Sequence, residues 1–214
     1  MMIAAMAVGA MTPSAIAVEI SGASSKKRTV FGTSERQART QVGFQKWHGM
    51  LGRHRAQLDQ AVREACESSW FARCPFKDWD SFLKEIRNDS LMDKIKLING
   101  FANRVRYIDD MRNYRLSDFW ATPLEFLKNR GDCEDYAITK YLSLKALGIP
   151  VEDMRIVVLK DTNIREHHAI LIVDVNGFQM VLDNQTDYVV EDRLIRHYAP
   201  IYSLNEQGAW FHTR

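Results

Sequence analysis

Three residues in the second half of the chain could together perform nucleophilic catalysis. Cys133 lies in the segment "NRGDCEDYAITKYLSLKALGIP". Downstream, His168 opens the apolar run "HAILIVDV" and Asp183 ends the run "FQMVLD". A nucleophilic cysteine needs a histidine to take its proton and usually a third group to orient the imidazole ring. The pattern therefore permits a Cys-His-Asp triad. Taken singly, the three residues also fit a core cysteine, a strand-edge histidine and a turn-forming aspartate.

The two acids that flank the cysteine pose an electrostatic problem. Negative charge nearby raises a thiol pKa, so Asp132 and Glu134 make the Cys133 thiolate harder to form. The first turn of a helix compensates in part, because its N–H groups are unpaired and its dipole is positive there. Asp132 alone would be explained as a helix N-cap, but capping does not explain Glu134. Either Cys133 is an inert core residue or another group offsets these charges.

Length and composition allow one domain or two lobes that share a cleft. The chain has 214 residues, with 29 Lys and Arg against 27 Asp and Glu, which gives a formal charge of +2. This balance gives no electrostatic reason to expect a nucleic-acid partner. Of the three cysteines, Cys66 and Cys74 are eight positions apart, close enough for a local disulfide in an oxidising compartment. That pairing would leave Cys133 free.

The N-terminal segment is typical of an export signal. Residues 1–17 contain no charged side chain and end in an Ala-x-Ala pattern at Ala15 and Ala17. This pattern predicts the apolar core and cleavage site of a signal peptide, truncated because the basic start is missing; a buried N-terminal helix is the alternative. Residues 18–42 are rich in Ser, Thr, Lys and Arg and are expected to form a flexible leader.

The remaining chain is expected to form an α+β domain over 43–214. The helical lobe, 43–150, should contain helices at 44–66, 78–88, 90–107, 123–129 and 133–147, with a polar connection at 109–119. Gly148 and Pro150 should end the last helix. In the β lobe, 151–214, short apolar runs predict strands at 154–160, 168–175 and 178–183, with a hairpin turn at Asn176-Gly177. Helices first and antiparallel strands after are typical of an α+β fold.

Two consecutive histidines, His167 and His168, stand at the start of the first strand of the hairpin. Strand alternation puts His168 with Ile170 on one face and His167 with Ala169 on the other, so only one histidine can face the helix. With a stagger, His168 and Asp183 can meet at the same end of the hairpin.

The segments "TPLEFLKNRGDCEDYAITKYLSLKALGIP", "HHAILIV" and "VLDN" resemble the transglutaminase-like cysteine peptidases, and within them the LapG family of periplasmic proteinases. The resemblance covers about 101–184, and "GDCEDY" is its most specific part. It implies a papain-like core in which a helical lobe bearing the cysteine packs on a sheet bearing histidine and aspartate. It assigns the nucleophile to Cys133, the base to His168 and the third member to Asp183. His168 is preferred to His167 because the family's histidine directly precedes the small-then-aliphatic strand.

The resemblance also implies a calcium site formed by acids beside the nucleophile. Asp132 and Glu134 match those acids, and Asp135, one turn from Asp132, could add a ligand. Calcium takes six to eight oxygen ligands, which carboxylates at a helix start can supply. A bound ion would offset the charge beside Cys133. Three loop acids are weaker candidates: Asp109, Asp110 and Asp118.

Taken together, the resemblance implies a calcium-dependent periplasmic cysteine endopeptidase. Its expected substrate is the N-terminal region of a large RTX-type adhesin, whose release from the outer membrane promotes biofilm dispersal. Its expected inhibitory partner is a LapD-like inner-membrane receptor for cyclic di-GMP; the chain itself has no nucleotide-binding motif. Two alternatives are a transglutaminase or amidase with the same triad, and a catalytically silent binding protein, against which the presence of all three triad residues weighs. Trp120 could line the substrate cleft, although a core position explains it more simply.

Overall fold

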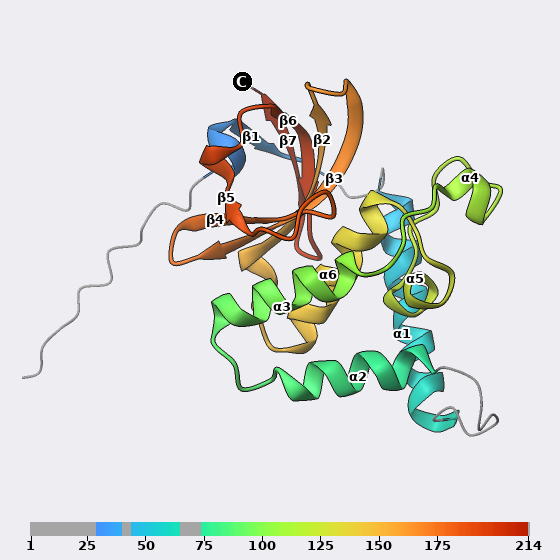
Figure 1. Ribbon diagram of the computed structural model, residues 1–214. Coiled ribbons are helices and arrows are strands. Elements are labelled where there is room, and N and C mark those ends of the chain that lie inside the picture. The colour runs from blue at the N-terminus through green and yellow to red at the C-terminus, as the bar shows by residue number, and fades with distance from the viewer. Residues whose placement is uncertain (1–28, 40–43, 65–73, 214) are drawn as a thin grey trace, which may run out of the picture.

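The computed structural model describes residues 29–39, 44–64 and 74–213. Apart from one short N-terminal strand, the N-terminal part of the chain forms helices and the C-terminal part forms most of the sheet. The helices pack below the sheet in the view of Figure 1. Within the described residues the sheet has seven strands in the order β1-β7-β6-β2-β3-β4-β5, and each neighbouring pair is antiparallel. The expected α+β fold is confirmed.

The helical lobe follows the expected order with shifted boundaries. α2 begins three residues early because Cys74 is its N-cap and Pro75 is suited to the first helical position. α3 starts as expected, with Ser90 Oγ accepting a hydrogen bond from the Asp93 N–H at 3.2 Å. The polar connection contains one helical turn, α4. The helices are α1 (Gln45–Glu64), α2 (Pro75–Glu85), α3 (Leu91–Asn103), α4 (Asp110–Asn113), α5 (Pro123–Asn129) and α6 (Cys133–Ala146).

Helix α6 is the central element of the fold. It packs on β2 and β3 and is covered by α3 and α5 (Figure 1). Its residues Ile138, Tyr141 and Leu144 are fully buried in the main core, and every residue from 135 to 144 is buried, so the helix is enclosed on nearly all sides. The helix ends before Gly148, whose φ of 85° is the left-handed conformation that favours glycine. Cys133 is therefore the first residue of a rigid, buried helix.

The sheet is built around the predicted hairpin. Asn176 and Gly177 have φ values of 55° and 86°, as a tight hairpin turn requires. Leu171 of β3 belongs to the core shared with α6, whereas Ile170 belongs to a second cluster on the opposite face, so the expected alternation is confirmed. The strands are β1 (Ser34–Gln37), β2 (Met154–Asp161), β3 (Glu166–Val175), β4 (Phe178–Leu182), β5 (Val190–Glu191), β6 (Tyr198–Leu204) and β7 (Ala209–Thr213).

Part of the expected flexible leader belongs to the β lobe. β1 pairs with β7 at the edge of the sheet, and Glu35 of this strand forms a 2.6 Å ion pair with Arg155 of β2. The prediction of a flexible leader up to residue 42 is therefore wrong over 29–39. These residues contain a polar edge strand, although their sequence is rich in Ser, Thr and Arg. The expected signal peptide at 1–17 lies outside the described residues. No helix in the described ranges is long and apolar enough to cross a membrane.

Candidate active site

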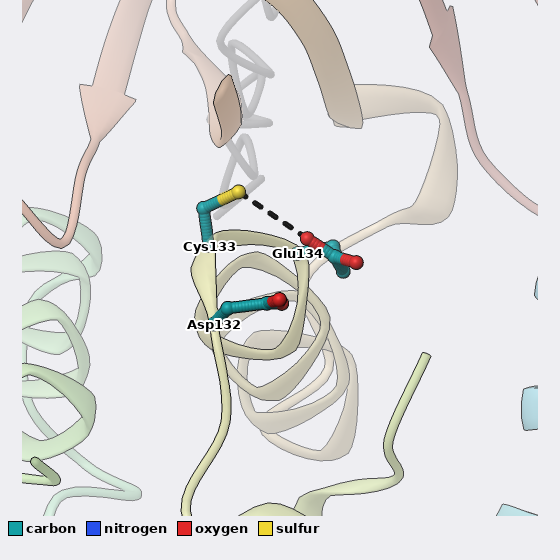
Figure 2. Close-up of side chains that lie close together, drawn as sticks. All are labelled: Asp132, Cys133 and Glu134. Atoms are coloured by element: carbon teal, nitrogen blue, oxygen red, sulfur yellow. Dashed lines mark hydrogen bonds between the residues drawn. The ribbon is translucent and has the colours of Figure 1, made fainter. Parts of the chain in front are cut away.

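Cys133 occupies the start of α6, where two acidic side chains surround it. Its Sγ donates a hydrogen bond to Glu134 Oε2 at 3.2 Å (Figure 2). The Asp132 carboxylate extends to the same side as Glu134, so the sulfur and both carboxylates lie within 4.8 Å of one another. The backbone N–H of Ala169 in β3 also contacts the sulfur, and it opposes only in part the rise in the thiol pKa that burial causes. The thiol therefore lies against the strand that carries the two histidines.

His168 and Asp183 form a buried pair at the end of the hairpin. His168 Nε2 lies 2.8 Å from Asp183 Oδ1, and only 5% and 3% of the two residues are exposed. The His168 ring is buried beside Tyr198, with ring centroids 5.9 Å apart, whereas His167 is exposed. With Nε2 bound to the carboxylate, Nδ1 is the nitrogen left to accept a proton.

Further hydrogen bonds fix the Asp183 carboxylate. The Tyr198 hydroxyl donates to Oδ2 at 2.6 Å, and the Gln185 N–H donates to Oδ1 at 2.9 Å. Burial acts to raise the pKa of Asp183, but the hydrogen bond and charge of His168 and these two donors outweigh it, so the pKa is lowered. Asp183 is thus an anion that can hold the imidazole ring in one tautomer and orientation.

The loop after Asp183 is fastened to the helical lobe. Asn103 Nδ2 donates to the Asp183 carbonyl at 3.0 Å and to Asp187 Oδ1 at 2.9 Å. Asn99 Nδ2 donates to the carbonyl oxygens of Thr186 and Asp187 at 3.1 and 3.2 Å. These bonds from α3 fix the position of Asp183 relative to α6.

The surroundings of Cys133 disfavour the thiolate. Burial, followed by the charges of Glu134 and Asp132, raises the pKa of the thiol. Among the described residues, no hydrogen bond joins Cys133 to His168. The structure thus brings the thiol to the histidine-bearing strand, but it directs the thiol proton to Glu134.

The acids near Cys133 form one cluster of closely spaced carboxylates. Burial, followed by Glu134, raises the pKa of Asp132 to about 8, and burial raises the pKa values of Glu134 and Asp110 to about 6. Oδ1 of both Asp110 and Asp132 is buried with no hydrogen-bond partner among the described residues. Three sets of side chains lie close enough to hold a metal ion: Asp132, Cys133 and Glu134; Asp110, Asp118 and Glu134; and Asp110, Asp132 and Asp135.

Asp135 also holds the segment before α6 in place. Its Oδ1 accepts the Ala121 N–H at 2.6 Å, and its Oδ2 accepts the Asp132 N–H at 3.3 Å. Gly131 lies against this carboxylate, and a Cβ at position 131 would come within 2.8 Å of the Asp135 Cβ. Asp135 thus has a local structural role in addition to its place in the carboxylate cluster.

The three loop acids that were weaker metal candidates differ in the contacts that their carboxylates make. Asp109 caps α4 by accepting the Arg112 N–H at 3.0 Å, and Asp118 pairs with Lys46. Asp110, in contrast, is buried within the cluster and retains the unpaired oxygen noted above. Asp110 is therefore the loop acid best placed to add a ligand.

Two of the three cysteines lie within the described residues. Cys133 is free, and Cys74 is disulfide-bonded. Cys66, its expected partner, lies outside the described residues.

The sequence did not indicate a role for Tyr198, and for Trp120 it favoured a core position over a place in the substrate cleft. Tyr198 starts β6, a strand with few apolar signals, and nothing local links it to Asp183, 15 positions away. Trp120 is 7% exposed and packs edge-on against Trp47 with ring centroids 6.4 Å apart. It also lines a cavity of about 260 Å³, so it is mainly a core residue with one face toward a hollow.

The chain resembles solved structures and matches one protein family. Calcium-bound LapG from Legionella pneumophila is 25% identical, with a TM-score of 0.63 over 72% of this chain and 86% of that chain. The EGTA-treated form is 26% identical, with a TM-score of 0.60 over 65% and 77%. No curated protein gave a significant match. A scan of protein families matches residues 64–213 to the bacterial transglutaminase-like cysteine proteinases (BTLCP). Because this match spans most of the chain and contains Cys133, His168 and Asp183, the protein belongs to that family.

Proposed function

We propose that this cysteine proteinase is a calcium-dependent periplasmic endopeptidase with Cys133 as nucleophile, His168 as base and Asp183 as orienting group. The observation that carries the proposal is the buried His168–Asp183 pair, 2.8 Å apart, with His168 on the strand against which the Cys133 thiol lies. A transglutaminase-like family and a free cysteine at a helix start support the same roles.

These residues can carry out peptide cleavage in two steps. His168 Nδ1 takes the Sγ proton, and the Cys133 thiolate attacks the scissile carbonyl carbon. The imidazolium then gives its proton to the departing amine, which leaves a thioester on Cys133. Water, activated by the neutral imidazole, hydrolyses the thioester and restores the thiol. Throughout the cycle, Asp183 Oδ1 holds the Nε2–H and stabilises the charged ring.

The carboxylate cluster suits a calcium ion, with Asp132, Glu134, Asp135 and Asp110 as proposed ligands. Two buried carboxylate oxygens without partners and several carboxylates with raised pKa values fit a hard divalent cation. Calcium would supply positive charge that offsets the acids beside Cys133. Glu134, which now accepts the thiol proton, competes with His168 for it. When its carboxylate is engaged elsewhere, the thiol is released toward the base.

Similarity to LapG supports a protein substrate. We propose the N-terminal region of a large RTX-type adhesin, whose cleavage releases the adhesin from the outer membrane and disperses the biofilm. The inhibitory partner we propose is a LapD-like receptor for cyclic di-GMP in the inner membrane, which fits a protease exported to the periplasm.

A cleavage assay tests the proposal directly. Purified protein with calcium is incubated with N-terminal fragments of adhesins from its own genome, and Cys133→Ala protein serves as control. We expect one specific cut with the wild type and none with the variant. No cut in any fragment would contradict the adhesin substrate, whereas a cut by Cys133→Ala protein would contradict the nucleophile.

A further inference from the structure

A basic cavity lies beside the start of α6, outside the triad and the acidic cluster. Its volume is about 430 Å³. It is formed by the segment that connects α3 to α4, by α4 itself and by the C-cap residue of α5. The lining residues are Arg106, Tyr107, Ile108, Asp109, Arg112 and Arg130.

The cavity adjoins the nucleophile through backbone contacts. Tyr107 forms a parallel β-bridge with Gly131, and the Ile108 N–H donates to the Gly131 carbonyl at 2.9 Å. Gly131 is two residues before Cys133. A peptide bound across Cys133 thus has its neighbouring side chains near this cavity.

The lining of the cavity carries three arginines and one acid. Its one acid, Asp109, lies 4.0 Å from the Arg112 guanidinium and also caps α4. Arg106 and Arg130 are exposed, and no carboxylate in the described ranges lies within ion-pair distance of either. Three guanidinium groups around one hollow, with one acid among them, favour an anionic ligand.

The backbone at Arg130 strengthens this interpretation. Arg130 has a φ of 70°, a left-handed conformation in which glycine would cost less. Its carbonyl accepts a hydrogen bond from Asn113 Nδ2 at 3.2 Å, and its N–H donates to the Phe126 carbonyl at 2.7 Å, so the conformation is held on both sides. An arginine at a position suited to glycine is consistent with selection for its side chain.

We infer that this cavity is a specificity subsite for an acidic side chain, Asp or Glu, close to the scissile bond of the substrate. The inference rests on the proposed proteolysis by Cys133 and names the class of peptide that the site prefers. Arg106 and Arg130 would bind the substrate carboxylate, and Arg112, tied to Asp109, would add charge at the rim. Tyr107, 53% exposed, would form the wall between this subsite and the thiol.

Peptide cleavage profiling tests the subsite. Calcium-loaded wild-type protein is incubated with a proteome-derived peptide library, and mass spectrometry identifies the cut bonds. We expect Asp and Glu to be enriched at one fixed position near the cut. Two quenched fluorogenic peptides are then made that differ only by Glu or Gln at that position. We expect kcat/KM to be about five- to tenfold higher for the Glu peptide, as a charge-assisted contact in a partly exposed site would give.

Matched variants separate recognition from folding. Arg106→Gln and Arg130→Gly should lower kcat/KM for the Glu peptide to the value for the Gln peptide and leave the Gln peptide unchanged. Arg130→Gly suits the left-handed backbone, so its Tm should not fall. Arg87→Gln, at an exposed arginine between α2 and α3, should change neither peptide.

The outcomes distinguish this inference from the proposed function. Cleavage of the library without acidic preference, or an equal loss on both peptides in Arg106→Gln and Arg130→Gly, would overturn the subsite and leave the protease standing. Failure of the wild type to cut any peptide in calcium would overturn the proposed proteolysis and the subsite with it.

Discussion

The Cys133 thiol donates its hydrogen bond to Glu134 Oε2, 3.2 Å away, and not to His168. The acid next in sequence to the proposed nucleophile therefore acts as a competing acceptor for the thiol proton. The His168–Asp183 pair is already formed, so the proposed base is in place while the thiol is held by Glu134. Activation then depends on what happens to the Glu134 carboxylate.

Removal of calcium should stop proteolysis reversibly. In EGTA, the Glu134 carboxylate is free to hold the thiol, and the charge of Asp132 is not offset, so cleavage of the adhesin fragment should cease. Added calcium should restore cleavage. Magnesium should restore it poorly, because it demands tighter octahedral geometry and dehydrates reluctantly. Full proteolysis in EGTA by protein that contains no measurable calcium would refute the proposed metal role.

Loss of a proposed ligand should weaken calcium binding. Glu134→Gln should lower calcium affinity at least about tenfold, measured by isothermal titration, because supporting residues alone affect metal affinity by that much. The exposed Glu166→Gln is the matched control and should bind calcium as the wild type does. Equal calcium affinity in Glu134→Gln and wild type would remove Glu134 from the ligand set.

Of the two adjacent histidines, only His168 should be needed for cleavage. His168→Ala should reduce the cleavage rate to background because the thiol loses its base, whereas the exposed His167→Ala should remain active. Asp183→Asn should leave a trace of activity, since the base remains but is wrongly oriented. Circular dichroism of each variant checks that the fold is kept. Normal rates in His168→Ala with loss in His167→Ala would reverse the assignment.

The Tyr198 hydroxyl should contribute to catalysis through Asp183. In Tyr198→Phe, Asp183 Oδ2 loses its 2.6 Å donor, so the buried carboxylate is less well fixed and its pKa rises. We expect kcat to fall several-fold, with KM nearly unchanged and the acidic limb of the pH–rate profile moved to higher pH. A fall in Tm with an unshifted pH profile would indicate a purely structural role.

Sequence reasoning found the elements whose signals are local. The α6 segment, with its capping region and Gly148 stop, and the Asn176-Gly177 hairpin were placed correctly because propensity, apolar pattern and turn chemistry agree there. β1 was missed because an edge strand such as Ser34–Gln37 needs little apolar sequence when its ladder bonds and the Glu35–Arg155 ion pair hold it.

The site was predicted as residue types but not as a network. Cys133, His168 and Asp183 stand in recognisable contexts, and the structure brings the last two together. The bond from Tyr198 to Asp183 depends on β6 folding beside β2, and the bond from Cys133 to Glu134 depends on a side-chain rotamer. The spacing of residues along the sequence predicts neither hydrogen bond.

Gly131 should tolerate no side chain. In Gly131→Ala, the new Cβ would overlap the Asp135 carboxylate and displace it from the Ala121 and Asp132 N–H groups. We expect a loss of about 1–3 kcal/mol in the free energy of unfolding, together with weaker calcium binding. Gly100→Ala, where a Cβ meets nothing within 4 Å, is the control and should not be destabilised by steric overlap. Wild-type stability and calcium affinity in Gly131→Ala would show that the cluster can shift to accommodate a methyl group.

Helix α6 also contains a buried lysine, Lys140. Its burial should affect how the free energy of unfolding depends on pH. Lys140 is fully buried, its Nζ has no hydrogen-bond partner among the described residues, and it lies 5.9 Å from the centroid of the Tyr136 ring. Burial lowers its pKa to about 7, although the charges of Asp183 and Asp187 oppose the shift. In the unfolded chain a lysine titrates near pH ~10.4.

Replacement of Lys140 should therefore flatten a rise in stability at alkaline pH. Between about pH 7 and ~10.4 the unfolded chain holds a proton on Lys140 that the native protein has released, so this group makes the free energy of unfolding rise with pH, by at most ~1.4 kcal/mol per unit. Lys140→Met keeps the buried volume without the charge and should lose that slope while gaining stability at pH 7. Urea unfolding between pH 7 and 9.5, in the presence of EGTA to exclude calcium effects, measures the slope. Lys96→Met, at an exposed lysine of α3, should keep the wild-type slope. Identical slopes in Lys140→Met and wild type would show that Lys140 is already neutral or solvated in the native protein across this range.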